Sequence, residues 1–430
     1  MSECTDFYQQ QAQRLVSATD WLASLQKDAL TDFVQLGFPS RDDEDWKYTS
    51  TDSFLKQSFV QPPASEHLDK HAVAVVATGR QTDAPVGMKI ALVNGVVIAL
   101  DSLAKSLPPG VIVQPLNQAI HEHPEKIKPY LGKILQHEHG FQALNTAMLG
   151  FGLFIYVPQN VCLAEPLLLT HWQTTADQAT FLRHVIVAET GSSLCVIEDY
   201  QGEATSSYFT NTMTEVYAAP QAKVTHYKIQ RESKLAYHVG HIAVKQAASS
   251  QFDSHLVSLG GQWSRSDVTI HLSESNARCL LNGIYATADG QHMDHHTLIN
   301  HTVPDCFSEQ DYKGILTGHS RAVFNGKVFV AQKAQRTQAK QQNKNLLLSK
   351  TAEIDTKPQL DIYADDVTCT HGATVGQLDE EALFYFATRG IDAAEASRYL
   401  IQAFAASNLQ AINHSPLSSW MSGLLSHQIG

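Results

Sequence analysis

Turn-forming residues recur at an almost constant interval through the middle of the chain. Between residues 190 and 305, clusters of small and polar residues separate short apolar segments. The first apolar residues after these clusters lie 30, 28, 27 and 28 residues apart, at Leu194, Val224, Phe252, Cys279 and Phe307. A period of this length is typical of a solenoid, in which each repeat packs only against its neighbours. This period constrains the fold more than any other feature of the sequence.

The segments between the turns have the pattern of β-strands. Val185-Ile186-Val187 is β-branched throughout, and Val268 to Leu272 alternates apolar with polar residues. Such patterns favour strands over helical repeats. The sequence therefore predicts a mainly β chain, with a β-helix from about residue 150 to 375.

Helical patterns precede the repeat. Residues 1 to about 37 have helical spacing, and we expect Asp6 to cap a first helix. A second helix is expected to begin near Leu30 and to stop at Gly37. Residues 61 to 88 are predicted to form a loop, because they contain Pro62-Pro63 and show no periodicity.

Two further elements are predicted between the loop and the repeat. Asn94-Gly95 lies between two apolar runs that begin at Ile90 and Val96, which predicts a tight β-hairpin. Residues 116 to 149 return to helical spacing and predict a helical insert.

The end of the chain is again helical in pattern. Asp379 and Asp392 are predicted N-caps of two helices, and Gly390 lies between them as a stop signal. This helical pair needs the solenoid end or another protein on which to bury its apolar faces. We therefore divide the chain into an N-terminal helical region with a loop (1–88), a core (89–375) and a C-terminal helical domain (376–430).

The composition excludes several classes of function. A net charge of −12 disfavours binding to nucleic acid or to anionic membranes, which requires a basic surface. No run approaches the roughly 20 apolar residues of a membrane span, and no signal peptide is readable, so a cytoplasmic location is expected. The six cysteines contain no Cys-x-x-Cys pair, which disfavours zinc ribbons and thioredoxin-like motifs. No phosphate-binding loop is present, so ATP hydrolysis is not expected.

The densest group of the 21 histidines is the run His292 to His301. On a strand, His292, Asp294 and His296 share one face and are a candidate metal site. Polar positions on a half-exposed strand are the favoured explanation, because the spacing matches no metalloenzyme signature such as His-Glu-x-x-His. A stand-alone metal-dependent enzyme built on a β-helix is accordingly the alternative function. A carbohydrate-active β-helix is disfavoured, because no paired acids lie on an aromatic face.

Cys369 and His371 form a second candidate metal site. Two residues apart on an extended chain, they lie on the same face, within reach of one soft metal or sulfide species. Iron–sulfur clusters are held by thiolates, with histidine as the usual substitute. No nearby residue orients the histidine as a base, so a catalytic pair is disfavoured. A buried cysteine and a hydrogen-bonded histidine in the last turn of the solenoid remain the structural alternative.

A basic, glutamine-rich stretch runs from Lys327 to Lys350. It lacks the interleaved aromatic residues of an RNA-binding surface. We expect a solvated or partner-facing surface.

A series of short segments, spread along the chain in a fixed order, carries a family resemblance. They are Arg41 with Glu44–Thr49, Tyr312–Ile315, Phe324–Lys327, Gln338-Ala339, Asn345–Ser349, Pro358–Val367 and Cys369–Gly376. Together they resemble the SufB/SufD family of iron–sulfur cluster assembly scaffolds. The resemblance is dense from about 295 to 405, recognisable near 41 to 49 and thin between them. Within the family, the chain resembles SufD-type rather than SufB-type subunits, because SufB proteins are usually longer and richer in cysteine.

The resemblance implies a right-handed parallel β-helix with helical N- and C-terminal regions. It implies a SufB-like subunit pairing at the end of the β-helix, a SufC-like ABC-type ATPase docking on the C-terminal helices, and a homodimer when the chain is alone. His371, and less strongly Cys369, would contact iron or a nascent cluster at the SufB-like interface. No catalytic residue and no tightly bound cofactor are expected.

Overall fold

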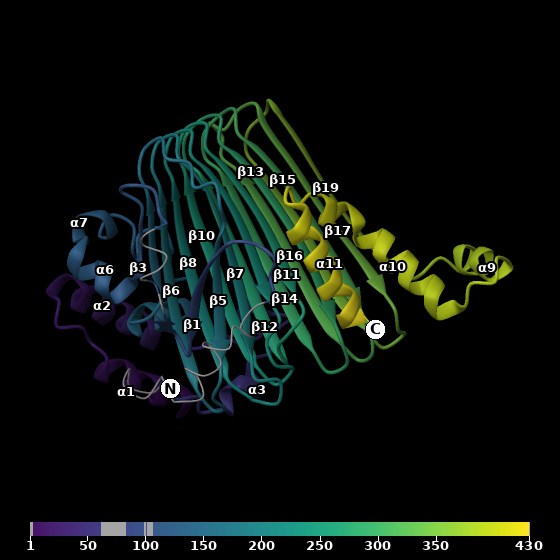
Figure 1. The fold of residues 1–430 in the computed structure, drawn as a ribbon, viewed down its shortest axis with the longest axis horizontal. Helices are drawn as coiled ribbons and strands as arrows, with labels where there is room; N and C mark the ends of the chain where they lie inside the picture. Colours follow the sequence, from purple (N-terminus) through teal and green to yellow (C-terminus); the bar gives the residue numbers. More distant parts are fainter. Residues whose placement is uncertain (1–2, 62–82, 99, 101–105, 430) are drawn as a thin grey trace.

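Two large β-sheets lie face to face and form the body of the molecule (Figure 1). The computed structural model describes residues 3–61, 83–98, 100 and 106–429. The ten-stranded sheet has the order β19-β17-β15-β13-β11-β9-β7-β5-β1-β2, and the nine-stranded sheet has the order β18-β16-β14-β12-β10-β8-β6-β4-β3. From β4 onward the chain alternates between the sheets, so two successive strands make one coil of a parallel β-solenoid. The prediction of a mainly β, parallel β-helix fold is confirmed.

The strands have the following bounds. The ten-stranded sheet contains β1 (Met88–Val93), β2 (Val96–Ile98), β5 (Leu167–Gln173), β7 (Ser193–Gly202), β9 (Lys223–Gln230), β11 (Gln251–Ser258), β13 (Arg278–Thr287), β15 (Phe307–Leu316), β17 (Thr337–Leu347) and β19 (Val367–Gly376). The nine-stranded sheet contains β3 (Ile112–Pro115), β4 (Leu153–Val157), β6 (Ala179–Ala188), β8 (Phe209–Ala218), β10 (Tyr237–Gln246), β12 (Trp263–Leu272), β14 (His292–His301), β16 (Arg321–Val330) and β18 (Glu353–Ile362).

The predicted period matches the strand register in all but one place. Leu194, Val224, Phe252 and Cys279 pair in succession from β7 to β13. Cys279 then pairs with Ser308, and Phe307 lies one position away from the predicted match. Phe307 differs because its side chain faces outward, where its ring lies 4.3 Å from the guanidinium of Arg278.

Stacked turns explain the constant period. At one corner of successive coils, a residue adopts a positive φ, and its backbone N–H donates to a carbonyl of the next coil. Each turn thereby pairs with the one above it, as the strands do, and an insertion would break both ladders. Residues at these corners are Gln221, Ser249, Asp305 and Arg336.

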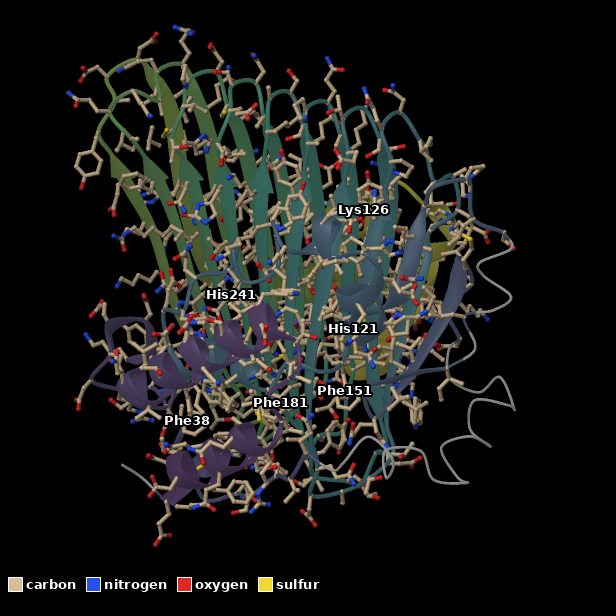
Figure 2. The ribbon with its side chains drawn as sticks, turned by 90° about the vertical axis from the view of Figure 1, so that its left-hand side faces the viewer. Phe38, His121, Lys126, Phe151, Phe181 and His241 are labelled. Atoms are coloured by element: carbon tan, nitrogen blue, oxygen red, sulfur yellow. The ribbon has the colours of Figure 1, made fainter. Side chains whose placement is uncertain are left out.

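Helices near the N-terminus cover the outer face of the nine-stranded sheet. Aromatic residues dominate this contact, including Phe38 and Phe181, which are labelled in Figure 2. The helices are α1 (Glu3–Arg14), α2 (Asp20–Leu36), the 3-10 helix η1 (Glu44–Trp46), α3 (Asp52–Leu55), α6 (Leu116–Glu122), α7 (Pro124–Ile127) and α8 (Gly140–Ala147).

The first helix break was predicted in the wrong place. Asp6 lies inside α1 instead of capping it, and the chain breaks at residues 15–19 instead of before Leu30. The side chain of Gln26 accepts from the backbone N–H of Ser17, at 2.7 Å, and Ser17 Oγ accepts from the N–H of Thr19. These local bonds replace helical ones. The predicted stop at Gly37 is confirmed, with φ of 64°.

The β-hairpin is confirmed, and the insert is only partly helical. Asn94 and Gly95 have φ of 47° and 86°, as a two-residue hairpin turn requires. Within residues 116 to 149, the stretch from 128 to 139 is not helical. The predicted loop at 61–88 lies largely outside the described residues.

Three helices close the chain: α9 (Glu380–Thr388), α10 (Ala393–Gln410) and α11 (Ser415–Ile429). The predicted caps are confirmed, since Asp379 accepts from two backbone N–H groups of α9 and Asp392 accepts from one of α10. Side chains of α10 and α11 pack on the outer face of the ten-stranded sheet. Helix α9 projects away from it (Figure 1). Among the described residues, no helix is both long and apolar enough to cross a membrane.

Candidate functional site

Both sheets end at the same open end of the solenoid, on β18 and β19. Among the described strands, each of these two has only one neighbour in its sheet. The N–H of Glu353 donates inward to the carbonyl of Ser320, just before β16, and the N–H of Tyr363, just after β18, donates to Val330 of β16. Because N–H directions alternate along a strand, the even-numbered residues of β18 direct their backbone groups away from the solenoid. Pro358, which has no N–H, occupies one of these outward positions, as proline does in edge strands.

Cys369 and His371 lie on the face of β19 that continues the solenoid interior. Each occupies the last position of a column of register partners running along the ten-stranded sheet. From β5 onward the partners in the column of His371 are Leu167, Val196, His226, Ser254, Leu281, Gln310 and Gln341, and all of them are buried. At the opposite end of the column lies Met88 of β1, which is half-buried. His371 is exposed because no further coil follows. A second protein stacked on this end would bury it.

Cys369 differs from His371 in its surroundings. Its side chain is half-buried and packs against the apolar interior cluster. Burial raises the pKa of the Cys369 thiol, and a bond with the backbone of Ala339 only partly opposes that shift. Since the thiolate is the form that binds metal, Cys369 is poorly prepared for ligation in the isolated chain. The predicted pair does share one face, and His371 is its accessible member.

The floor of this open end is polar. Gln341, Asn343 and Asn345 point inward from β17 and are all buried, whereas Lys340, Gln342 and Lys344 lie between them on the outward face. Asn343 accepts from Thr356 Oγ1 at 2.8 Å, which joins the two sheets. The inward face of this part of the Lys327–Lys350 stretch is therefore not solvated, and a partner-facing surface stays a prediction. The amides at every second position, 341, 343 and 345, were the signal that could have shown this.

The open end does not contain a complete metal site. Within the described part of the chain, no group of three or more His, Cys, Asp or Glu side chains is arranged to hold a metal ion. A metal bound between Cys369 and His371 would therefore need ligands from another molecule.

The run His292 to His301 forms β14, and its outward face holds the N-terminal segment. As predicted, His292, Asp294 and His296 share this face. Asp294 Oδ2 accepts from Thr49 Oγ1 at 2.6 Å, and His292 Nε2 lies 2.9 Å from the same hydroxyl. The other oxygen of Asp294 lies 3.0 Å from His296 Nε2. Their partners are protein groups, so the structure does not favour a metalloenzyme site here.

Arg265 completes this contact, and the sequence analysis missed it. Its guanidinium pairs with Asp267 and Asp294, each at 2.9 Å, and donates to the backbone carbonyl of Asp45 at 2.7 Å. The ring of Trp46 lies 4.0 Å from it. Burial alone would raise the pKa of Asp294, but His296 and Arg265 outweigh that effect and lower it. The resemblance segment at residues 44–49 is thus fixed to the solenoid by buried charges.

A polar cluster lies deeper in the interior, between the two sheets. Glu198 accepts from Tyr200 at 2.6 Å, from Thr214 at 2.9 Å and pairs with His226 at 3.1 Å. Burial lowers the pKa of the neighbouring Lys228 to about 8, although Glu198 opposes the shift. These residues alternate with apolar ones, so the sequence pattern alone did not distinguish them from surface positions.

A hydrophobic patch lies on the projecting helices. Phe384 is 71% exposed, Tyr385 57% and Tyr399 44%, and no residue of α9 is buried. Exposed aromatic residues grouped in this way mark interaction surfaces.

Comparison with known families accounts for nearly the whole chain. The model of the SUF system FeS cluster assembly SufBD core domain matches residues 171–404, and the model of the SufBD protein N-terminal region matches residues 1–169. The matched core domain contains Cys369, His371 and β14.

Individual relatives align over similar lengths. An iron–sulfur cluster assembly SufBD family protein of Synechocystis is 31% identical, covering 95% of this chain and 91% of the relative. The iron–sulfur cluster assembly protein SufD of Escherichia coli is 32% identical, covering 89% and 87%. SufD of Bacillus subtilis is 26% identical, covering 94% and 93%. These matches confirm the resemblance found in the sequence: the chain belongs to the SufB/SufD family of iron–sulfur cluster assembly proteins.

Proposed function

We propose that the chain is a non-catalytic scaffold subunit of a cytoplasmic SUF complex, pairing with a SufB-like subunit and a SufC-like ATPase. The observation that carries this proposal is the open end of the solenoid. There His371 ends a column whose members from β5 to β17 are all buried, beside strand edges that have no partner among the described strands. Unpaired strand edges favour association with another sheet, and a similar solenoid is the surface that fits them best.

The cargo of this interface is iron or a nascent iron–sulfur cluster, held transiently. His371 supplies one ligand, and Cys369 becomes a second when a partner's positive charge or metal stabilises its thiolate. The remaining ligands come from the SufB-like subunit, because the described residues contain no complete set. When that subunit is absent, two copies of the chain associate through the same open end, as an isologous contact allows.

The ATPase docks on the projecting helices. The exposed aromatic residues of α9 and α10 supply the anchors that such an interface needs. Helix α10 also packs against β13 and β15. A movement of the docked ATPase is therefore transmitted through α10 to the solenoid. Nucleotide turnover then shifts the two solenoids relative to each other and opens the site around His371.

The role of His371 is tested by His371→Ala in the complete complex, co-expressed with SufB- and SufC-like subunits. We expect cluster absorbance per complex to fall about tenfold or more, since even partners of metal ligands contribute 10- to 100-fold to affinity. His121→Ala, an exposed histidine on α6, is the matched control and should leave absorbance unchanged. Unchanged cluster content in His371→Ala would remove His371 from the site, and failure of the SufB-like subunit to co-purify would refute the pairing.

Docking of the ATPase is tested by Phe384→Asp. The substitution places a charge on the most exposed of these aromatic residues without removing a buried contact. A lost hot-spot contact of about 2 kcal/mol should weaken binding of the SufC-like subunit about 30-fold, measured by titration calorimetry. Leu235→Asp, on an exposed turn of the solenoid, should bind like the wild type. Equal affinities for the two variants would place the docking surface elsewhere.

A further inference from the structure

Two glutamines form a short amide ladder that leads to His371. Gln341 Nε2 donates to Gln310 Oε1 at 3.1 Å, and Gln310 Nε2 donates to Thr297 Oγ1 on the opposite sheet at 2.6 Å. Stacked amides in parallel, in-register strands donate in one direction and accept from the other. The direction of these bonds therefore turns the carbonyl of Gln341 toward the next position of its column, which is His371.

The carbonyl of Gln341 lacks the partner that this ladder calls for. The side chain is 2% exposed, and its Oε1 is buried without a hydrogen-bond partner among the described residues. A buried acceptor without a donor loses its hydrogen bond to water and gains nothing in return, so a donor in the adjacent position is strongly favoured. Register partners in neighbouring strands lie about 4.8 Å apart, which brings an imidazole N–H within reach of this oxygen.

We propose that Gln341 is the positioning residue of His371: its Oε1 accepts a hydrogen bond from one imidazole N–H. That bond fixes the tautomer, so the other ring nitrogen presents its lone pair toward the open end. Histidines that bind metals usually donate their second N–H to an oxygen in this way. The consequence for iron rests on the proposed function, whereas the hydrogen bond itself is a property of this chain alone.

The bond is tested by NMR of the full chain labelled with ¹⁵N-histidine, using long-range ¹H–¹⁵N correlations to identify the tautomer. His371→Gln assigns the signal by its loss. We expect one tautomer in the wild type, both tautomers in Gln341→Leu, and one again in Gln341→Glu, which restores an acceptor. Leucine suits this position, because Leu281 already occupies the same column two coils earlier. The control, Gln338→Leu, changes an exposed residue of β17 and should match the wild type.

A second measurement separates this inference from the proposed function. In the assembled complex, Gln341→Leu should weaken iron binding about 10- to 100-fold, and Gln341→Glu should remain within a few-fold of the wild type. An identical tautomer ratio in the wild type and Gln341→Leu would overturn the positioning role, whatever the complex does. If the tautomer responds as expected but His371→Ala binds iron normally, the ligand role of His371 fails and the hydrogen bond stands.

Discussion

Replacing Glu215 with alanine is expected to lower the free energy of unfolding by about 4 kcal/mol or more. Glu215 lies on the outward face of β8 and is fully buried beneath the insert. Its carboxylate accepts from the backbone N–H groups of Gly132, Lys133, Ile134 and Leu135, at 2.8 to 3.2 Å. It also pairs with the guanidinium of Arg183 at 2.9 Å.

The size of the effect follows from what the substitution leaves behind. Removing one member of a buried ion pair costs about 3–5 kcal/mol, because the other charge stays buried without compensation. Here Arg183, which is 1% exposed, would keep only its bonds to Asn145 and Thr146. The backbone donors of residues 132–135 would lose their acceptor in the same step, and each buried donor left without one adds to the cost.

Urea unfolding of the full chain measures this loss. Glu215→Gln keeps a carbonyl acceptor but loses the charge, so it should fall between the wild type and Glu215→Ala. Glu165→Ala removes an exposed carboxylate and should change stability by no more than about 0.5 kcal/mol. A loss below about 1 kcal/mol in Glu215→Ala would show that other contacts hold the insert in place.

Glu215 also shows why the insert was predicted too regularly. The helical spacing of Ile127, Leu131 and Ile134 is present in the sequence, but four successive N–H groups of this stretch bind a carboxylate 80 residues away. Such a long-range acceptor overrides local periodicity. The Asn94-Gly95 hairpin and the caps at Asp379 and Asp392 were predictable, because their signals are local.

The solenoid and its functional end were predictable to different degrees. The stacked turns produce a constant period that can be seen in the sequence. The column that ends at Gln341 and His371 depends instead on which residues pair between successive coils. The outward-facing Phe307 shows how easily that register shifts when apolar character is the only guide. The functional candidate His371 came from its spacing to Cys369 together with the resemblance segment, but its positioning residue needed the pairing of β17 with β19.

Acid is expected to destabilise the protein between pH 6.5 and about 4, through histidines that are buried without charge. Burial lowers the pKa of His255, His295 and His301 to about 4 in each case. In the unfolded chain these groups titrate near 6.5, so the unfolded state takes up protons first as the pH falls. The stability that these uncharged histidines contribute is therefore fully present above pH 6.5. It declines as the pH falls toward 4, and below pH 4 these groups cause no further loss.

The comparison of the wild type with His301→Gln isolates one such histidine from the titrating carboxylates. For each such histidine, the free energy of unfolding changes by up to about 1.4 kcal/mol per pH unit in this range. Over the whole range this amounts to roughly 3 kcal/mol per histidine. Glutamine can keep the 2.8 Å contact that His301 Nε2 makes with Ser308 Oγ and cannot be protonated. Urea unfolding at pH 7, 6 and 5 should therefore show a slope shallower by about 1 kcal/mol per unit on average in His301→Gln, because the unfolded histidine is only partly protonated above pH 6. The same substitution at the exposed His427 is the control and should leave the slope of the wild type. Parallel lines for the wild type and His301→Gln would mean that folding does not lower the pKa of His301.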